Sequence, residues 1–144
     1  FGQIYWLTGN ILIDRANRSK AMGTIDQVIA KMKESHLSIW MFPEGTRSRG
    51  RGLMPFKTGA FHTAIGAQTQ IIPIVCSTTQ GKIKLNRWNN GHVIVEMLPP
   101  VDVAGYQKSD VRELSNKCRT MMEEKLKQLD AEVEEKNRLE GVKN

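Results

Sequence analysis

The sequence lacks several features that would assign it to a common class of protein. Its 144 residues include only two cysteines, Cys76 and Cys118, so there is neither a disulfide framework nor metal-ligand spacing. We therefore expect a reducing compartment. No apolar run approaches the roughly 20 residues that a membrane-spanning helix needs, and no secretory signal pattern is present. No P-loop, serine elbow or metal-ligand cluster occurs, so the sequence predicts no metal site.

Histidine is also scarce, which restricts the choice of a catalytic base. His36, His62 and His92 are the only imidazoles. The first follows the expected end of a helix, the second lies on a short expected helix, and the third follows a turn. None has a carboxylate at a spacing typical of a catalytic dyad. The residues themselves therefore predict no catalytic group, and packing or capping is the simpler role for these histidines.

What the chain does contain is an ordinary globular composition with a local excess of positive charge. It is 40% hydrophobic and 25% charged, and its length suits a single domain over residues 1–144. The net charge is +6, and residues 44–87 hold seven basic side chains and only one acidic side chain. Such a field favours an anionic partner, which leaves a phosphorylated substrate, an anionic membrane surface or nucleic acid.

The apolar pattern predicts an α/β fold, with a mostly parallel or mixed sheet flanked by helices. The short apolar runs that are typical of buried strands are residues 11–13, 39–42, 70–77 and 93–97. Helical periodicity covers residues 22–32 and Gly59 to Ala67, and it continues in a long carboxyl-terminal helix after Ser109. The polar tail over residues 132–144 is expected to fray.

The residues that follow the 39–42 run predict a phosphate pocket. Gly45 lets the backbone approach a ligand closely, and Thr46 and Ser48 offer hydroxyl groups. Arg47 offers a planar fork of donors that matches phosphate oxygens two at a time. Each such charge-assisted bond contributes about 1.5–3 kcal/mol. The alternative is a solvated basic loop.

Other polar residues also follow expected strands. Ligands of open α/β sheets gather at the carboxyl ends of strands, where Arg15 and Cys76–Thr79 lie. Arg15 fits a shared phosphate pocket, although an ion pair with Asp14 is equally open. Lys57 precedes the short helix, whose amino terminus favours anions, although a plain surface lysine is equally open. The remaining basic residues, which suit membrane headgroups, are Arg49, Arg51, Lys82, Lys84 and Arg87.

Three residue blocks, taken in order, resemble the signature of the glycerolipid acyltransferases. Gly9–Arg15 is similar to their second block, Phe42–Ser48 resembles the third, and Ile71–Val75 resembles the fourth. Pro55–Ala60 is similar to the segment that follows the third block. The resemblance covers most of the chain and is strongest to the bacterial 1-acylglycerol-3-phosphate acyltransferases.

The resemblance implies an enzyme of phospholipid synthesis. The reaction would transfer a fatty acyl group from acyl-coenzyme A or acyl carrier protein to the free hydroxyl of lysophosphatidic acid, giving phosphatidic acid. No cofactor is implied. The expected location is a membrane surface, at the cytoplasmic face of the bacterial inner membrane. Alternatives are an acyltransferase acting on glycerol 3-phosphate or another lysophospholipid, and a nucleic-acid-binding module. Nucleic acid is not expected as a partner, because the basic loop lacks neighbouring aromatic side chains for stacking.

The resemblance also assigns roles to residues. Those of the acceptor pocket would be Arg15, Glu44, Gly45, Thr46, Arg47 and Ser48. Pro73 would help to shape the acyl side, and we add Lys57 for its charge and position. In the family, a histidine followed five residues later by an aspartate supplies the base and its orienting group. No histidine here has that aspartate, so we expect this block upstream of Phe1 and no catalytic residue within residues 1–144.

Overall fold

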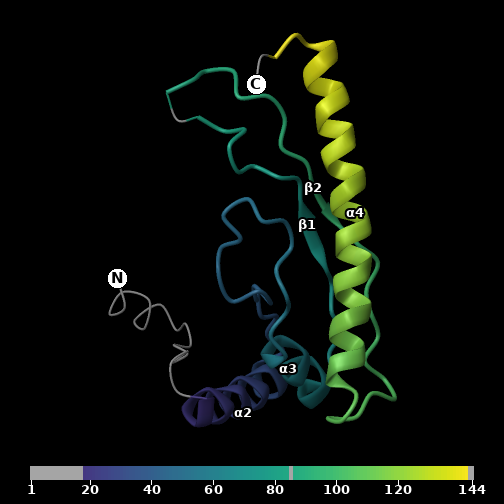
Figure 1. Cartoon of the computed structure of the whole chain (residues 1–144). Helices are drawn as coiled ribbons and strands as arrows, with labels where there is room; N and C mark the ends of the chain where they lie inside the picture. Colours follow the sequence, from purple (N-terminus) through teal and green to yellow (C-terminus); the bar gives the residue numbers. More distant parts are fainter. Residues whose placement is uncertain (1–17, 85, 143–144) are drawn as a thin grey trace.

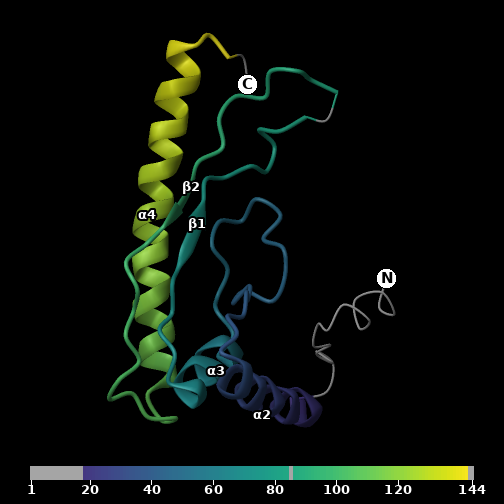
Figure 2. The same cartoon turned by 180° about the vertical axis from the view of Figure 1, so that it is seen from behind.

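The computed structural model describes residues 18–84 and 86–142. Its helices and strands are α2 (Arg18–Ser35), α3 (Gly59–Ala67), β1 (Ile74–Cys76), β2 (Val95–Met97) and α4 (Val111–Leu139). Helix α4 extends about 43 Å, at 1.5 Å per residue, and the hairpin of β1 and β2 lies along it (Figure 1). Helices α2 and α3 gather near its amino-terminal end, as the opposite view also shows (Figure 2). The predicted strand at 11–13 and the predicted site residue Arg15 lie outside the described residues.

Strands β1 and β2 pair antiparallel, with Val75 opposite Glu96 and Cys76 opposite Val95. The pairing continues beyond the strands, because the Leu98 N–H donates to the Pro73 carbonyl at 2.9 Å. The sequence predicted a mostly parallel or mixed sheet, but within the described residues the only pairing is antiparallel. A parallel pair needs a crossover, usually a helix, and the described part of the β1–β2 connection contains none. The predicted α/β elements and the long carboxyl-terminal helix are present.

Residues 39–42 differ from the buried strand that the sequence predicted. No strand pairs with them in the part of the chain that the structure describes. Trp40 is 67% exposed and Phe42 is 78% exposed. Their rings meet edge to face, with centroids 6.2 Å apart. An apolar run becomes a buried strand only where a neighbouring strand and a covering layer are present, and the described residues supply neither here.

The core consists of two clusters along α4. Near the start of the helix, Leu114 and Cys118 pack with Phe61 of α3. Burial raises the pKa of the Cys118 thiol, because the low-dielectric surroundings disfavour the thiolate. Further along, Leu129 packs with Val75 of β1 and with Leu98. Each fully buried side chain of this size stabilises the fold by about 1.5–3 kcal/mol, so α4 joins α3 and the hairpin into one packed unit.

Helix α4 continues to Leu139, although the sequence predicted fraying from Glu132. Two residues of this last part are buried, since Val133 is 1% exposed and Asn137 is 5% exposed. The Asn137 Oδ1 accepts the backbone N–H of His92 at 3.0 Å. Tertiary contacts therefore hold a segment whose composition is mostly polar.

We predict that Asn137→Ala lowers the free energy of unfolding by about 1–3 kcal/mol, because the partly buried His92 N–H loses its acceptor. Urea denaturation measures the change. The matched control is Asn116→Ala, an exposed asparagine on the same helix, which should shift stability by less than about 0.5 kcal/mol. Equal effects of the two substitutions would contradict this role for Asn137.

Candidate functional site

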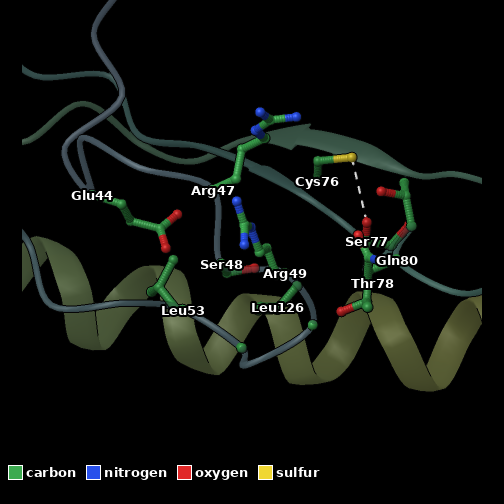
Figure 3. Close-up of a pocket in the computed structure, with 13 residues that line it drawn as sticks. Glu44, Arg47, Ser48, Arg49, Leu53, Cys76, Ser77, Thr78, Gln80 and Leu126 are labelled. Carbon is green, nitrogen blue, oxygen red and sulfur yellow. Dashed lines mark hydrogen bonds between the residues drawn. The ribbon is translucent and has the colours of Figure 1, made fainter.

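A cavity of about 460 Å³ lies between the loop over residues 44–53 and the segment over residues 76–80 (Figure 3). Leu126 of α4 completes its lining. The residues that line it are Glu44, Arg47, Ser48, Arg49, Gly50, Gly52, Leu53, Cys76, Ser77, Thr78, Thr79, Gln80 and Leu126. Two segments that are distant in sequence thus face each other across the cavity.

Two hydrogen bonds close the base of the 44–53 loop. The Lys57 N–H donates to the Pro43 carbonyl at 2.8 Å. The half-buried Glu44 carboxylate accepts the N–H of Met54 at 2.7 Å, ten residues further along the chain. A hydrogen bond to a charged group is stronger than one between neutral groups. The bond from Met54 to Glu44 therefore holds the two ends of the 44–53 loop together. Its carboxylate is already engaged by the backbone, which suits a structural role at the cavity edge.

Gly45 makes the tight turn that begins the loop. Its φ is +65°, a left-handed conformation, and its N–H donates to the Phe42 carbonyl at 3.0 Å. A Cβ at this position would lie 3.1 Å from Cδ of Lys57. Glycine therefore permits both the turn and the close passage of the lysine stem. Lys57 lies beside the turn and does not line the cavity.

The arginines of the loop have different surroundings. Arg51 donates from Nε to the Ser48 carbonyl at 2.9 Å, so it supports the loop from within. Arg47 and Arg49 line the cavity. In Figure 3 Arg49 lies beside Ser48, whereas the side chain of Arg47 extends away from Ser48. Arg49 has a left-handed φ of +54°, which costs a non-glycine residue about 1–2 kcal/mol. Such strain clusters at functional sites, where the surrounding structure maintains it.

The facing wall is held by its own hydrogen bonds. The buried Ser77 donates its N–H to the Ile94 carbonyl at 2.9 Å and accepts the Ile94 N–H on Oγ at 3.1 Å. Thr78 donates both its N–H and its hydroxyl to Asp130 of α4. These two hydroxyls bond within the protein, which leaves Thr79 and Gln80 as exposed polar residues of this wall.

The structure brings some of the predicted site residues together and separates others. Glu44, Arg47 and Ser48 line the cavity, whereas Gly45 lies in the turn that begins the 44–53 loop and is not part of the lining. Thr46 is exposed and outside the lining, and Pro73 is buried in the extended hairpin. The roles of these residues remain predictions. The sequence predicted that Arg49 belongs to a general basic face, whereas it lines the cavity. The sequence did not indicate that Gln80 and Leu126 line it, because residues brought in from distant parts of the chain leave no local motif.

None of the three histidines lines the cavity. His36 lies at the exposed carboxyl end of α2, and His62 is half-buried on α3. His92 places Nε2 at 2.8 Å from the carboxylate of Glu140, the residue after α4. Glu140 is 14 residues, or about 21 Å along a helix, beyond Leu126. The cavity therefore has no imidazole base of its own.

The described ranges contain neither a cluster of metal ligands nor a membrane-spanning helix. Residues 18–84 and 86–142 hold no group of three or more His, Cys, Asp or Glu side chains that could bind a metal ion. Among these residues there is also no helix long and apolar enough to cross a membrane. The cavity between the 44–53 loop and the 76–80 segment carries the guanidinium groups of Arg47 and Arg49 and the hydroxyl of Ser48.

Comparison with known proteins identifies the family. The sequence profile described as "Acyltransferase" matches residues 1–77. The chain belongs to the acyltransferase family. It is 65% identical over 136 residues to the 1-acyl-sn-glycerol-3-phosphate acyltransferase of Escherichia coli, covering 94% of this chain and 56% of that protein. It is 38% identical over 123 residues to the alpha form of the Homo sapiens enzyme, covering 84% of this chain and 44% of that one.

A solved structure agrees with this assignment. The crystal structure of the 1-acyl-sn-glycerophosphate (LPA) acyltransferase from Thermotoga maritima superimposes with a TM-score of 0.63 at 25% identity, covering 78% of this chain and 46% of that chain. This similarity confirms the predicted acyltransferase-like fold class. The chain spans about half the length of the bacterial relatives that it matches, since it covers 56% of one and 57% of another.

We predict that Glu44→Ala releases the Met54 end of the loop and lowers the free energy of unfolding by about 1.5–3 kcal/mol, the range for bonds to charged groups. Glu44→Gln keeps an oxygen acceptor and should lose less. Hydrogen exchange at the Met54 amide, with urea denaturation, measures both variants. Unchanged protection of that amide in Glu44→Ala would contradict the assigned bond.

Proposed function

We propose that the protein containing this chain transfers a fatty acyl group from acyl-coenzyme A or acyl carrier protein to the free hydroxyl of 1-acylglycerol 3-phosphate. The product is phosphatidic acid. The observation that carries the proposal is the lining of the cavity by Arg47, Ser48 and Arg49. The chain that forms this cavity is 65% identical to a 1-acyl-sn-glycerol-3-phosphate acyltransferase.

The cavity chemistry suits the acceptor's headgroup. Arg47 and Arg49 supply two guanidinium groups, and Ser48 supplies a hydroxyl, all from the 44–53 loop. A phosphate dianion accepts several charge-assisted bonds from such a set, each contributing about 1.5–3 kcal/mol. The negative charge of Glu44 opposes this attraction. The Met54 N–H is bound to that carboxylate and offsets part of its charge. The sum favours a phosphorylated acceptor over a neutral lipid.

The rest of the acceptor is matched by the remaining lining. Thr79 and Gln80 on the facing wall offer polar groups to the glycerol backbone. Leu53 and Leu126 give the cavity an apolar side, which suits the first carbons of the acyl chain. A ligand with a phosphate, a hydroxyl and an apolar chain uses all three kinds of lining.

The cavity positions the acceptor, and the proton transfer belongs to other residues. The base, a histidine oriented by an aspartate in the family that the sequence resembles, would come from a part of the protein outside this chain. It removes the proton of the free hydroxyl while that oxygen attacks the thioester carbonyl. The new C–O bond forms, the C–S bond breaks, and the proton passes to the departing thiolate.

The loop that joins β1 to β2 is our candidate for membrane contact. Trp88 is fully exposed, Ile83 is 42% exposed, and the neighbouring basic residues are Lys82, Lys84 and Arg87. Tryptophan favours the interface between water and hydrocarbon, and basic residues near an anionic surface contribute about 1 kcal/mol each. We therefore place this loop against the cytoplasmic leaflet of the bacterial inner membrane, where the lipid acceptor resides.

We predict that Arg47→Ala in the full-length protein raises KM for lysophosphatidic acid by about 10–100-fold, from the charge-assisted bonds lost. Initial rates at varied acceptor concentration measure it. The matched control is Arg112→Ala, which removes the same charge from an exposed position on α4 and should leave KM unchanged. Unaltered acceptor kinetics in Arg47→Ala would refute its role, and equal use of glycerol 3-phosphate would change the assigned acceptor.

We also predict that the double substitution Lys82→Glu, Lys84→Glu lowers binding to phosphatidylglycerol vesicles by about tenfold or more, since each reversed charge replaces attraction with repulsion. Vesicle flotation measures binding, and emission from Trp88 in a variant lacking the other two tryptophans should shift to the blue on binding. The matched control is Lys108→Glu, Lys117→Glu, an exposed pair elsewhere. Equal losses in both double variants would show that only net charge matters.

A further inference from the structure

We propose that Arg119 and Asp130 of α4 are positioning residues that set the separation of the two cavity walls, and thereby the affinity for the acceptor's phosphate. The inference rests on the proposed function, because it assigns that separation to binding of the acceptor. Neither residue lines the cavity, so each would act through the segment that it holds.

The periodicity of α4 places both residues on the same face as Leu126. Arg119 and Asp130 are 11 residues apart, which is three turns with a residual rotation of about 20°. Along the helix axis they are separated by about 16 Å. Leu126 lies between them and lines the cavity. One face of α4 therefore carries two attachment points, Arg119 and Asp130, with the cavity-lining Leu126 between them.

Asp130 holds the 76–80 wall with both of its carboxylate oxygens. Oδ1 accepts the Thr78 N–H at 2.7 Å, and Oδ2 accepts the Thr78 hydroxyl at 2.8 Å. The two residues are 52 positions apart in the sequence, so the contact is entirely tertiary. Two short charge-assisted bonds fix both the position and the orientation of Thr78. Thr79 and Gln80, which line the cavity, follow directly.

Arg119 holds the opposite wall. Its Nη2 donates to the Leu53 carbonyl at 3.1 Å, across 66 positions of sequence. Its Nη1 lies 3.1 Å from Oε2 of Glu123, one turn along the helix, which orients the guanidinium group. Leu53 precedes Met54, whose N–H binds Glu44. The arginine therefore fixes the end of the loop whose other end presents Arg47.

The walls also meet directly on the other side of the cavity. A Cβ at Gly50 would lie 3.2 Å from Cγ of Gln80, so the two segments already approach closely there. With one contact at Gly50 and two attachments on α4, the walls have little freedom to separate. If either attachment is lost, the distance from the loop arginines to Thr79 and Gln80 increases, and a bound phosphate loses partners on one side.

The test uses the full-length protein, with Arg47→Ala measured in parallel. We expect Asp130→Ala and Arg119→Ala each to raise KM for lysophosphatidic acid by about tenfold, which corresponds to 1.4 kcal/mol, with kcat changed by less than about twofold. Asp130→Asn keeps one acceptor oxygen and should recover part of the affinity. The matched controls, Glu134→Ala and Arg112→Ala, alter exposed charges on the same helix and should leave both constants unchanged.

A merely structural role would give a different result, namely a lower fraction of active enzyme with an unchanged KM. Thr78→Val removes only the hydroxyl bond to Asp130 and should raise KM in the same direction by about threefold, so it serves if Asp130→Ala does not fold. An unchanged KM in these variants, with KM raised in Arg47→Ala, would overturn the positioning role and leave the proposed function standing. An unchanged KM in Arg47→Ala as well would overturn both.

Discussion

The packing of α4 against the β1–β2 hairpin is the contact on which the rest of the structure depends. A two-stranded hairpin is marginally stable in water, and here Leu129 covers Val75 and Leu98 on one of its faces. An ion pair of 2.8 Å between Lys125 and Glu96 adds a tie to β2. Both cavity walls are attached to this unit, so the site inherits its geometry from the helix.

The loop that carries Arg47 and Arg49 is held at its ends by bonds within the protein. The base of the 44–53 loop is closed by the bond between the Met54 N–H and the Glu44 carboxylate, and Arg49 within the loop has a left-handed φ. If Arg47 and Arg49 bind the acceptor's phosphate as proposed, this closure of the loop base lowers the entropic cost of binding. Under the proposed function the acid–base chemistry would belong to other residues of the protein, because none of the three histidines of this chain lines the cavity. The proposed function therefore divides acceptor binding and proton transfer between different parts of one enzyme.

The sequence predicted those features that depend on local pattern. Helix α3 lies at Gly59–Ala67 as its composition indicated, and the stripe with Ile25, Val28 and Met32 is buried in α2. Local pattern failed where tertiary partners decide. The 39–42 run has no neighbouring strand among the described residues, and α4 continues to Leu139, where the buried Asn137 accepts the partly buried His92 N–H. The family blocks located Arg47 and Ser48, but nothing local linked them to α4. The one local sign of this link was Asp130, a charged residue that directly follows Leu129 of the apolar stripe.

The central claim is that this cavity holds the acceptor's phosphate, and a crystal structure of the full-length protein with glycerol 3-phosphate bound tests it most directly. We expect phosphate oxygens within hydrogen-bonding distance of Arg47 and Arg49, with the glycerol directed toward Thr79 and Gln80 across the cavity. A phosphate bound elsewhere, with the guanidinium groups of Arg47 and Arg49 left in solvent, would contradict it.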